Sequence, residues 1–185
     1  YNVHFPLLEK NRPKKMLKKH LGVRHTKHIK EFFELMPNYA TWDDHDFGAN
    51  NCDGTVPYKL LPLENFEMMW RNPYYGETPA KNDGINTHFR QGESEFFLLD
   101  NRYFSNDSKK EMYGDAQLKW LEIKLKESTA TYKFIVSGAQ FLTLDKQGVH
   151  LNQYPKEREQ IIDIITKNKI TGVLFISGDR HFAEV

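Results

Sequence analysis

The sequence has little of several features that would place it at once in a special class of protein. Cys52 is its only cysteine, which excludes an internal disulfide and a metal site built from several thiolates. The formal net charge is +1, so no overall excess of charge points to nucleic acid or to an anionic membrane surface. No apolar run approaches the length that crosses a bilayer, and no internal repeat is visible. These absences leave a single globular unit as the expected organisation of residues 1–185.

Charge is nevertheless distributed unevenly along the chain. Residues 10–30 contain nine lysines and arginines and no acidic residue. Apolar residues recur among these charges as far as Pro37, which predicts a helical region that ends there. Two interpretations of this basic segment stay open: a solvated helical face, or a positive rim that attracts anionic substrates.

Short apolar segments predict strands, and longer segments with apolar residues on one face predict helices. Strands are expected at 39–42, 96–99, 132–136 and 172–176, and helices at about 63–71, at 115–126 and after Pro155. Residues 48–92 are rich in glycine, proline, asparagine and aromatic residues, which predicts a long, loop-rich insertion. The alternation of strands and helices in the second half of the chain predicts an α/β fold, with a layered sheet and crossover connections.

Polar side chains follow each of the four predicted strands. They lie at residues 43–46, 100–102, 137–140 and 177–181. In open α/β sheets, ligands bind at the carboxyl ends of the strands. The four polar clusters are therefore expected to converge on one crevice.

The first of these clusters is the most informative one. Asp43-Asp44-His45-Asp46 places three carboxylates and an imidazole side by side. Such crowding of negative charge is unfavourable unless a cation lies nearby, and these ligand types suit iron, manganese, zinc or calcium. The cluster therefore predicts a metal site with a neighbouring proton donor, and the cluster around Asp179 and His181 could close the same site.

Three motifs resemble, in order and spacing, the alkaline phosphatase D (PhoD-like) branch of the calcineurin-like metallophosphoesterases. They are Trp42-Asp43-Asp44-His45-Asp46 with Gly48 and Asn50, Leu99-Asp100-Asn101-Arg102, and Gly178-Asp179-Arg180-His181 with Glu184. The resemblance implies a layered β-sandwich flanked by helices, in which two or more metal ions and an activated hydroxide hydrolyse phosphate mono- or diesters. Family members also use a Gly-Asp-Asn-x-Tyr segment for metal binding, and nothing before Trp42 matches it. We therefore expect residues 1–185 to form a single partial domain, which could be inactive by itself.

The resemblance also implies roles for individual residues. Asp44 takes the place of a metal ligand, and His45 takes the place of the histidine that protonates the leaving oxygen. Asp179 and His181 resemble a pair of metal ligands at the end of a strand. Asp43 is a further expected ligand, although a short acid at this position could equally cap a turn by bonding the backbone.

Three other residues are expected to support this site. Asp46 could orient His45 through a hydrogen bond, as carboxylates commonly do in metal sites. Arg102 is the candidate phosphate contact because guanidinium makes paired hydrogen bonds with phosphate oxygens, and a structural ion pair with Asp100 is the alternative. Gln140 could ligate a metal or merely hydrogen-bond. The six remaining histidines are interpreted as surface or packing residues: His4, His20, His25, His28, His88 and His150.

The resemblance further implies iron with calcium as the metals, with manganese or zinc as alternatives, a phosphate ester as the substrate and an extracytoplasmic location. No nucleic-acid partner and no transmembrane segment are expected, and the oligomeric state stays open. The alternative function is a noncatalytic binding or regulatory domain that keeps the fold with an incomplete set of metal ligands. A nucleic-acid-binding role for residues 10–30 is disfavoured by the nearly neutral net charge.

Overall fold

A computed structural model describes residues 12–77, 83–143 and 148–181. Helices α1 (Arg12–Arg24), α2 (Lys27–Leu35), α3 (Asp44–Phe47) and α4 (Leu60–Met69) come first, followed by strands β1 (Thr87–Gln91) and β2 (Ser94–Leu98). The order then continues with helix α5 (Gly114–Glu127), strand β3 (Tyr132–Ser137), the short 3-10 helix η1 (Leu151–Gln153), helix α6 (Pro155–Lys167) and strand β4 (Val173–Ser177). Within the described ranges, every helix is too short or too polar to pass through a membrane.

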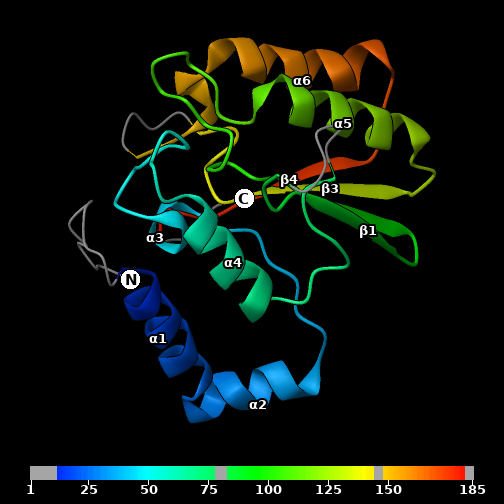
Figure 1. Ribbon diagram of the computed structural model, residues 1–185. Coiled ribbons are helices and arrows are strands. Elements are labelled where there is room, and N and C mark those ends of the chain that lie inside the picture. Colours follow the sequence, from blue (N-terminus) through cyan, green and yellow to red (C-terminus); the bar gives the residue numbers. More distant parts are fainter. Residues whose placement is uncertain (1–11, 78–82, 144–147, 182–185) are drawn as a thin grey trace.

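The four strands form one sheet in the order β1-β2-β3-β4. β1 and β2 are antiparallel and are joined through Gly92, whose φ of +61° lies in the left-handed region that glycine adopts easily. The β2–β3 and β3–β4 pairs are parallel, and their crossover helices α5 and α6 lie side by side over one face of the sheet (Figure 1). The α/β class expected from the sequence is therefore confirmed. The described part of the chain contains this one sheet of the expected sandwich.

The main core lies between the sheet and the two crossover helices. Phe97 of β2 and Ile135 of β3 pack in one cluster with Leu121 of α5 and Ile161 of α6, and all four side chains are 0% exposed. Burying one such side chain contributes about 1.5–3 kcal/mol to stability. This packing fixes where the parallel strands end and thereby places the loops that follow them.

The expected strand at 39–42 is wrong, because these residues have no regular secondary structure and do not join the sheet. Hydrogen bonds with side chains replace the backbone pairing that a neighbouring strand would provide. The Asn72 amide accepts a hydrogen bond from the Ala40 nitrogen at 3.1 Å and donates one to the Ala40 oxygen at 2.8 Å. The Thr41 hydroxyl donates to the Leu99 carbonyl oxygen at 2.6 Å. The segment therefore lies beside the end of β2, and both backbone polar groups of Ala40 are satisfied.

Two other segments differ from the expectation. Residues 48–92 contain β1 in addition to the expected helix α4, because pairing with β2 orders a stretch, THFRQ, that has no clear apolar alternation. The basic region forms two helices, α1 and α2, separated at residues 25–26. α1 packs against α4, on the side of the molecule away from α5 and α6 (Figure 1).

The second face of the sheet carries apolar and aromatic side chains. Phe89, Phe96 and Phe134 stack across β1, β2 and β3, with ring centroids 5.1 Å and 4.9 Å apart. Leu174 and Ile176 continue this face on β4, where they are 43% and 45% exposed. This face therefore leaves apolar surface in contact with solvent.

Candidate functional site

The acidic segment, residues 43–46, forms the start of the one-turn helix α3. Asp43 is the N-cap residue with an extended backbone, and it forms a reciprocal capping box with Asp46. In this box, the Asp43 backbone nitrogen donates to Asp46 Oδ2 at 3.3 Å. The capping interpretation of Asp43 thus corresponds to a contact in the structure, and its role as a metal ligand stays a prediction.

One carboxylate oxygen of Asp43 accepts several hydrogen bonds from the loop after β2. Asp43 Oδ1 accepts from Arg102 Nε at 2.8 Å, from Arg102 Nη2 and from Asn101 Nδ2 at 2.9 Å. Arg102 is only 2% exposed, and its Nη1 donates to the Cys52 carbonyl oxygen at 3.2 Å. Burial alone would lower the pKa of Arg102, but the Asp43 carboxylate outweighs this effect and the pKa is raised. The structural ion pair of Arg102 therefore has Asp43 as its acid, and contact with phosphate stays a prediction.

Asp44 is almost fully buried and is held by the backbone around it. It is 4% exposed, and its two oxygens accept hydrogen bonds from the His45 nitrogen at 2.6 Å and from the Asn51 nitrogen at 2.7 Å. The His45 side chain on the same turn is half-buried. Asp44 is thus fixed in orientation, whereas His45 is partly exposed to solvent.

Asp46 points toward helix α1. Its Oδ1 lies 3.7 Å from His20 Nε2, in addition to the capping contact with Asp43. The expected hydrogen bond, from the His45 ring to the Asp46 carboxylate, is not among these contacts, and this role of Asp46 stays a prediction. His20, which the sequence analysis interpreted as a surface or packing residue, therefore connects α1 to the acidic segment.

Asp100 joins the segment before α3 to the loop that carries Arg102. The carboxylate is 0% exposed, and its Oδ1 accepts hydrogen bonds from Trp42 Nε1 at 2.7 Å and from the backbone nitrogens of Arg102 and Tyr103 at 2.9 and 2.8 Å. Its Oδ2 accepts from the Ile85 nitrogen at 2.9 Å. This one carboxylate therefore sets how Trp42, and hence Asp43, lies relative to Arg102.

Gly138, directly after β3, lies against the acidic segment. A Cβ atom on Gly138 would be 2.3 Å from the Trp42 carbonyl oxygen and 2.9 Å from Asp43 Cβ. The Gly178 nitrogen, directly after β4, donates to the Gly138 carbonyl oxygen at 3.1 Å. The ends of β3 and β4 and the acidic segment therefore meet around a glycine that leaves room for close approach.

Asp179 is electrostatically coupled to the acidic segment. Burial raises the pKa of the Asp179 carboxyl above its ordinary value, and the negative charges of Asp43 and Asp44 raise it further. Asp179 and His181 both have left-handed backbones, with φ of +73° and +58°, which is unusual for residues other than glycine. Such strain is often found at functional sites. Asp179 therefore lies within electrostatic range of Asp43 and Asp44, and the roles of Asp179 and His181 as metal ligands stay predictions.

Gln140 and His150 lie next to each other on a short bridge after β3. The Leu151 nitrogen donates to the Gln140 carbonyl oxygen at 3.0 Å. Gln140 Oε1 and both ring nitrogens of His150 are buried and have no hydrogen-bond partner among the described residues. A metal-binding role for Gln140 stays a prediction. Glu184, the last residue of the third motif, lies outside the described residues.

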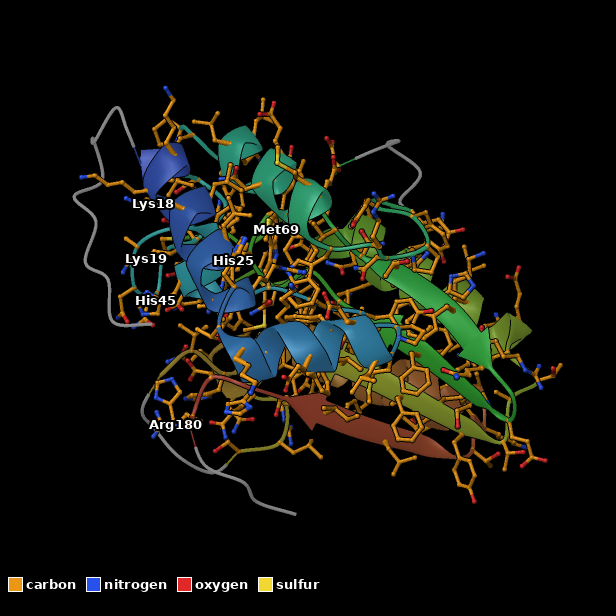
Figure 2. All side chains as sticks on the ribbon, turned by 90° about the horizontal axis from the view of Figure 1, so that it is seen from below. Lys18, Lys19, His25, His45, Met69 and Arg180 are labelled. Atoms are coloured by element: carbon orange, nitrogen blue, oxygen red, sulfur yellow. The ribbon has the colours of Figure 1, made fainter. Side chains whose placement is uncertain are left out.

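The basic helix α1 lies beside the acidic segment. Lys14 and Lys18 are exposed, and Lys18 and Lys19 lie on the same side of the molecule as His45 (Figure 2). The contact between His20 and Asp46 joins the two elements directly. The positive-rim interpretation of residues 10–30 is therefore consistent with the position of α1.

The donor atoms at this site suit a cation that prefers oxygen ligands. Burial is the main cause of the raised pKa of Asp179, and the negative charges of Asp43 and Asp44 add to it; a bound cation would favour the ionised form of all three. Asn101 adds a buried amide oxygen without a hydrogen-bond partner in the described part of the chain. The same described residues hold no group of three or more histidine, cysteine, aspartate or glutamate side chains placed to grip one ion.

Comparisons with known proteins agree with the family resemblance of the sequence. The chain is 23% identical over 203 residues to alkaline phosphatase D of Bacillus subtilis (strain 168), an alignment that covers 88% of this chain and 34% of that protein. It superposes on a solved structure titled "Structure of PhoD" with a TM-score of 0.74 and 20% identity, covering 91% of this chain and 39% of the other. The chain thus spans little more than a third of the length of these relatives. Residues 17–185 match the family model described as PhoD-like phosphatase, and the chain belongs to this family.

Proposed function

We propose that the protein hydrolyses phosphate esters with the help of bound metal ions. The observation that carries this proposal is the packing of the acidic segment against Gly138 at the end of β3, where the end of β4 also lies and where Asp43 and Asp44 act electrostatically on Asp179. Membership of the PhoD-like phosphatase family supports it. In a sheet of this kind, the carboxyl ends of parallel strands are the usual place for a ligand.

Asp43, Asp44, Asp179 and His181 are the residues that would hold the metal ions. Oxygen and imidazole donors fit iron with calcium, and manganese or zinc fit them as well. When bound, the ions supply positive charge to the transferring phosphate and make hydroxide available near neutral pH. The donors alone leave the choice of metal to experiment.

The side chains of the chain itself have separate tasks in this proposal. Arg102 and Asn101 fix one oxygen of Asp43 through hydrogen bonds. His45, half-buried on the same turn, would donate a proton to the oxygen of the leaving alcohol. Positive charge on α1 would attract the anionic ester toward this turn. Phosphate monoesters and diesters are both suitable substrates, and an extracytoplasmic location is part of the same proposal.

Variants at Asp44 and His45 test the proposal. We expect His45→Ala to bind metal normally and to lower kcat about 10²- to 10⁴-fold, with a greater loss for esters of poor leaving groups. Asp44→Asn keeps an acceptor for the backbone but removes the charge, so it should lower the metal content. Metal analysis and an ester-hydrolysis assay of the protein give both readouts.

Two exposed residues serve as matched controls for these variants. His25→Ala on the loop after α1 and Asp163→Asn on α6 make the same changes away from the acidic segment, and hydrolysis should not change. The proposed roles are wrong if Asp44→Asn and His45→Ala hydrolyse esters as fast as the unaltered protein. A protein that binds metal but hydrolyses no ester would instead support the noncatalytic alternative.

A further inference from the structure

We infer that Arg102 is a positioning residue that holds the turn bearing Asp43 and His45, and that its guanidinium does not contact the substrate phosphate. Each of the three guanidinium nitrogens already has an acceptor inside the protein. Nε and Nη2 donate to Asp43 Oδ1, and Nη1 donates to the Cys52 carbonyl oxygen at 3.2 Å. The paired contact that guanidinium makes with phosphate needs two neighbouring N–H groups, and one such pair is directed at Asp43 here.

The exposure of the two side chains points the same way. The Asp43 side chain is 19% exposed, whereas the Arg102 side chain is 2% exposed. A group that arrives from solution therefore reaches the Asp43 carboxylate, while the guanidinium is closed to it. Direct contact with phosphate requires Arg102 to leave its acceptors, which strands a buried charge without its partner.

The two acceptors of Arg102 lie on either side of helix α3. Asp43 is the residue directly before this helix, and Cys52 belongs to the loop that follows it. A helix of one turn has few hydrogen bonds of its own and depends on its surroundings to stay formed. Arg102 therefore fixes the start of α3 relative to the following loop, and with them the turn that carries His45.

A second buried side chain, Asp100, positions Arg102 in turn. Asp100 Oδ1 accepts hydrogen bonds from Trp42 Nε1 at 2.7 Å and from the Arg102 backbone nitrogen at 2.9 Å. Because Trp42 precedes Asp43 in the chain, these contacts form a closed ring through Asp100, Trp42, Asp43 and Arg102. Gln117 of α5 anchors this ring, since its side chain accepts from the Asp100 nitrogen at 2.7 Å and donates to the Asp100 oxygen at 2.8 Å.

Kinetics of Arg102→Lys distinguish positioning from contact with phosphate, and this part of the test rests on the proposed function. Lysine keeps the positive charge but lacks the planar fork that bonds Asp43. We expect kcat to fall about 10²-fold, because a small displacement of a catalytic group is enough for such a loss. KM and the inhibition constant of inorganic phosphate should stay within about threefold, whereas loss of a phosphate contact raises both.

Arg90→Lys is the matched control for this variant. Arg90 also bonds inside the protein, from Nε to the Gly92 carbonyl oxygen at 2.9 Å and from Nη1 to Thr129 Oγ1 at 2.7 Å. It lies on β1, outside the ring around Asp43. Hydrolysis and inhibition by phosphate should not change in Arg90→Lys.

Nuclear magnetic resonance of the Arg102 Nε–H group provides a test that does not depend on hydrolysis. The signal is assigned by its absence in Arg102→Lys. We expect its position to stay unchanged when inorganic phosphate is added. Trp42→Phe keeps an aromatic ring but removes the donor to Asp100, so the Nε–H group should exchange with solvent about two- to tenfold faster, the factor that one hydrogen bond contributes.

Trp120→Phe is the control for the exchange measurement. Trp120 Nε1 also donates to a carboxylate, Glu77 Oε2 at 2.7 Å, but this pair is outside the ring. Exchange of the Arg102 Nε–H group should be the same in Trp120→Phe and in the unaltered protein. Circular dichroism checks that each variant is folded.

The outcomes separate this inference from the proposed function. A large shift of the Arg102 signal on addition of phosphate overturns it, as does a tenfold rise of KM and of the phosphate inhibition constant in Arg102→Lys with kcat retained. Exchange that Trp42→Phe leaves unchanged overturns the ring. If the protein hydrolyses no ester, the proposed function fails, and the exchange rates still decide whether the ring holds Arg102.

Discussion

Gly138 occupies a position where any larger residue would collide with the backbone of another segment. The Trp42 carbonyl oxygen lies 2.3 Å from the place of a Cβ atom, and a backbone oxygen does not move aside as the end of a flexible side chain does. Glycine is required here because the Trp42 carbonyl oxygen lies so close, and not because of backbone conformation, since the φ of Gly138 is not left-handed. This glycine therefore sets how near β3 comes to the acidic segment.

Substitution of Gly138 by alanine tests this point. We expect Gly138→Ala to lower the free energy of unfolding by about 1–3 kcal/mol, because the added methyl group overpacks a filled space. Gly22→Ala is the control, since Gly22 lies in α1 with nothing within 4 Å of an added Cβ. That variant should gain about 0.5–1 kcal/mol. Urea denaturation measures both, and equal stability of Gly138→Ala and the unaltered protein would show that the contact is not tight.

Individual residues at the site differ in how far the sequence can predict them. Asp43, Asp44 and Asp179 could be selected because acids crowded after strands are chemically unusual. Asn101 and Gly138 could not, because their importance depends on which segment lies against the end of β3. The contact between His20 and Asp46 could not be predicted from the sequence either, because it depends on the position of α1 beside α3.

At the scale of elements, the packing of the segment after α4 against α5 depends on a cluster around Glu77. Glu77 Oε2 accepts a hydrogen bond from Trp120 Nε1 at 2.7 Å and lies 3.1 Å from His88 Nδ1. Glu77 Oε1 lies 3.4 Å from Lys124 Nζ. Partial burial alone would raise the pKa of Glu77, but the Trp120 and Tyr74 hydrogen bonds and the charges of Lys124 and His88 lower it. The ionised form of Glu77 therefore stabilises the contact between this segment, β1 and α5.

Glu77→Gln should reveal this contribution through its dependence on pH. A carboxyl with a lowered pKa in the folded state adds stability above its unfolded pKa of about 4.3, and this addition is lost as the pH falls through the folded pKa. We therefore expect Glu77→Gln to be less stable than the unaltered protein near pH 7. The difference should shrink below about pH 4.3. Glu64→Gln on α4 is the control, and a difference that stays constant down to low pH would contradict the prediction.

The elements themselves show which patterns are reliable. The expected positions of α5, α6, β3 and β4 are close to the observed ones, because amphipathic helices have a clear period and short apolar runs bounded by turn residues indicate strands. Residues 39–42 have the composition of a strand, but side-chain hydrogen bonds hold them outside the sheet. The Asn72 amide bonds both backbone groups of Ala40, and the Thr41 hydroxyl bonds the Leu99 carbonyl oxygen. β1 was not expected because its order comes from pairing with β2, and local sequence does not contain that information.

At the scale of the whole molecule, the two faces of the sheet differ. One face is covered by α5 and α6, whereas the other exposes Tyr132, Leu174 and Ile176 at 50%, 43% and 45% beside a stack of phenylalanine rings. Contiguous apolar surface of this kind commonly mediates association. We therefore expect residues 1–185, studied alone, to bind dyes that recognise apolar surface.

Replacing Leu174 by threonine tests which surface binds the dye. Leu174→Thr should lower the fluorescence of bound anilinonaphthalene sulfonate, because Leu174 pairs in register with Phe134 of the stack. Ile123→Thr is the control, since Ile123 is also 43% exposed but lies on α5. Equal loss of fluorescence in both variants would show that the dye does not prefer this face. Denaturation curves check that neither change unfolds the protein.

The position of β4 has a consequence for the candidate site. Within the described sheet, β4 pairs with β3 alone, and its residues are less buried than those of β2 and β3. Edge strands of this kind open locally at a lower free energy than the core does. Asp179 follows β4, so such an opening would carry it away from Asp43 while the packing of α5 remains intact. An ion held by both acids would oppose this local opening. As the ion concentration rises, amide hydrogen exchange in β4 should slow before the free energy of global unfolding changes measurably.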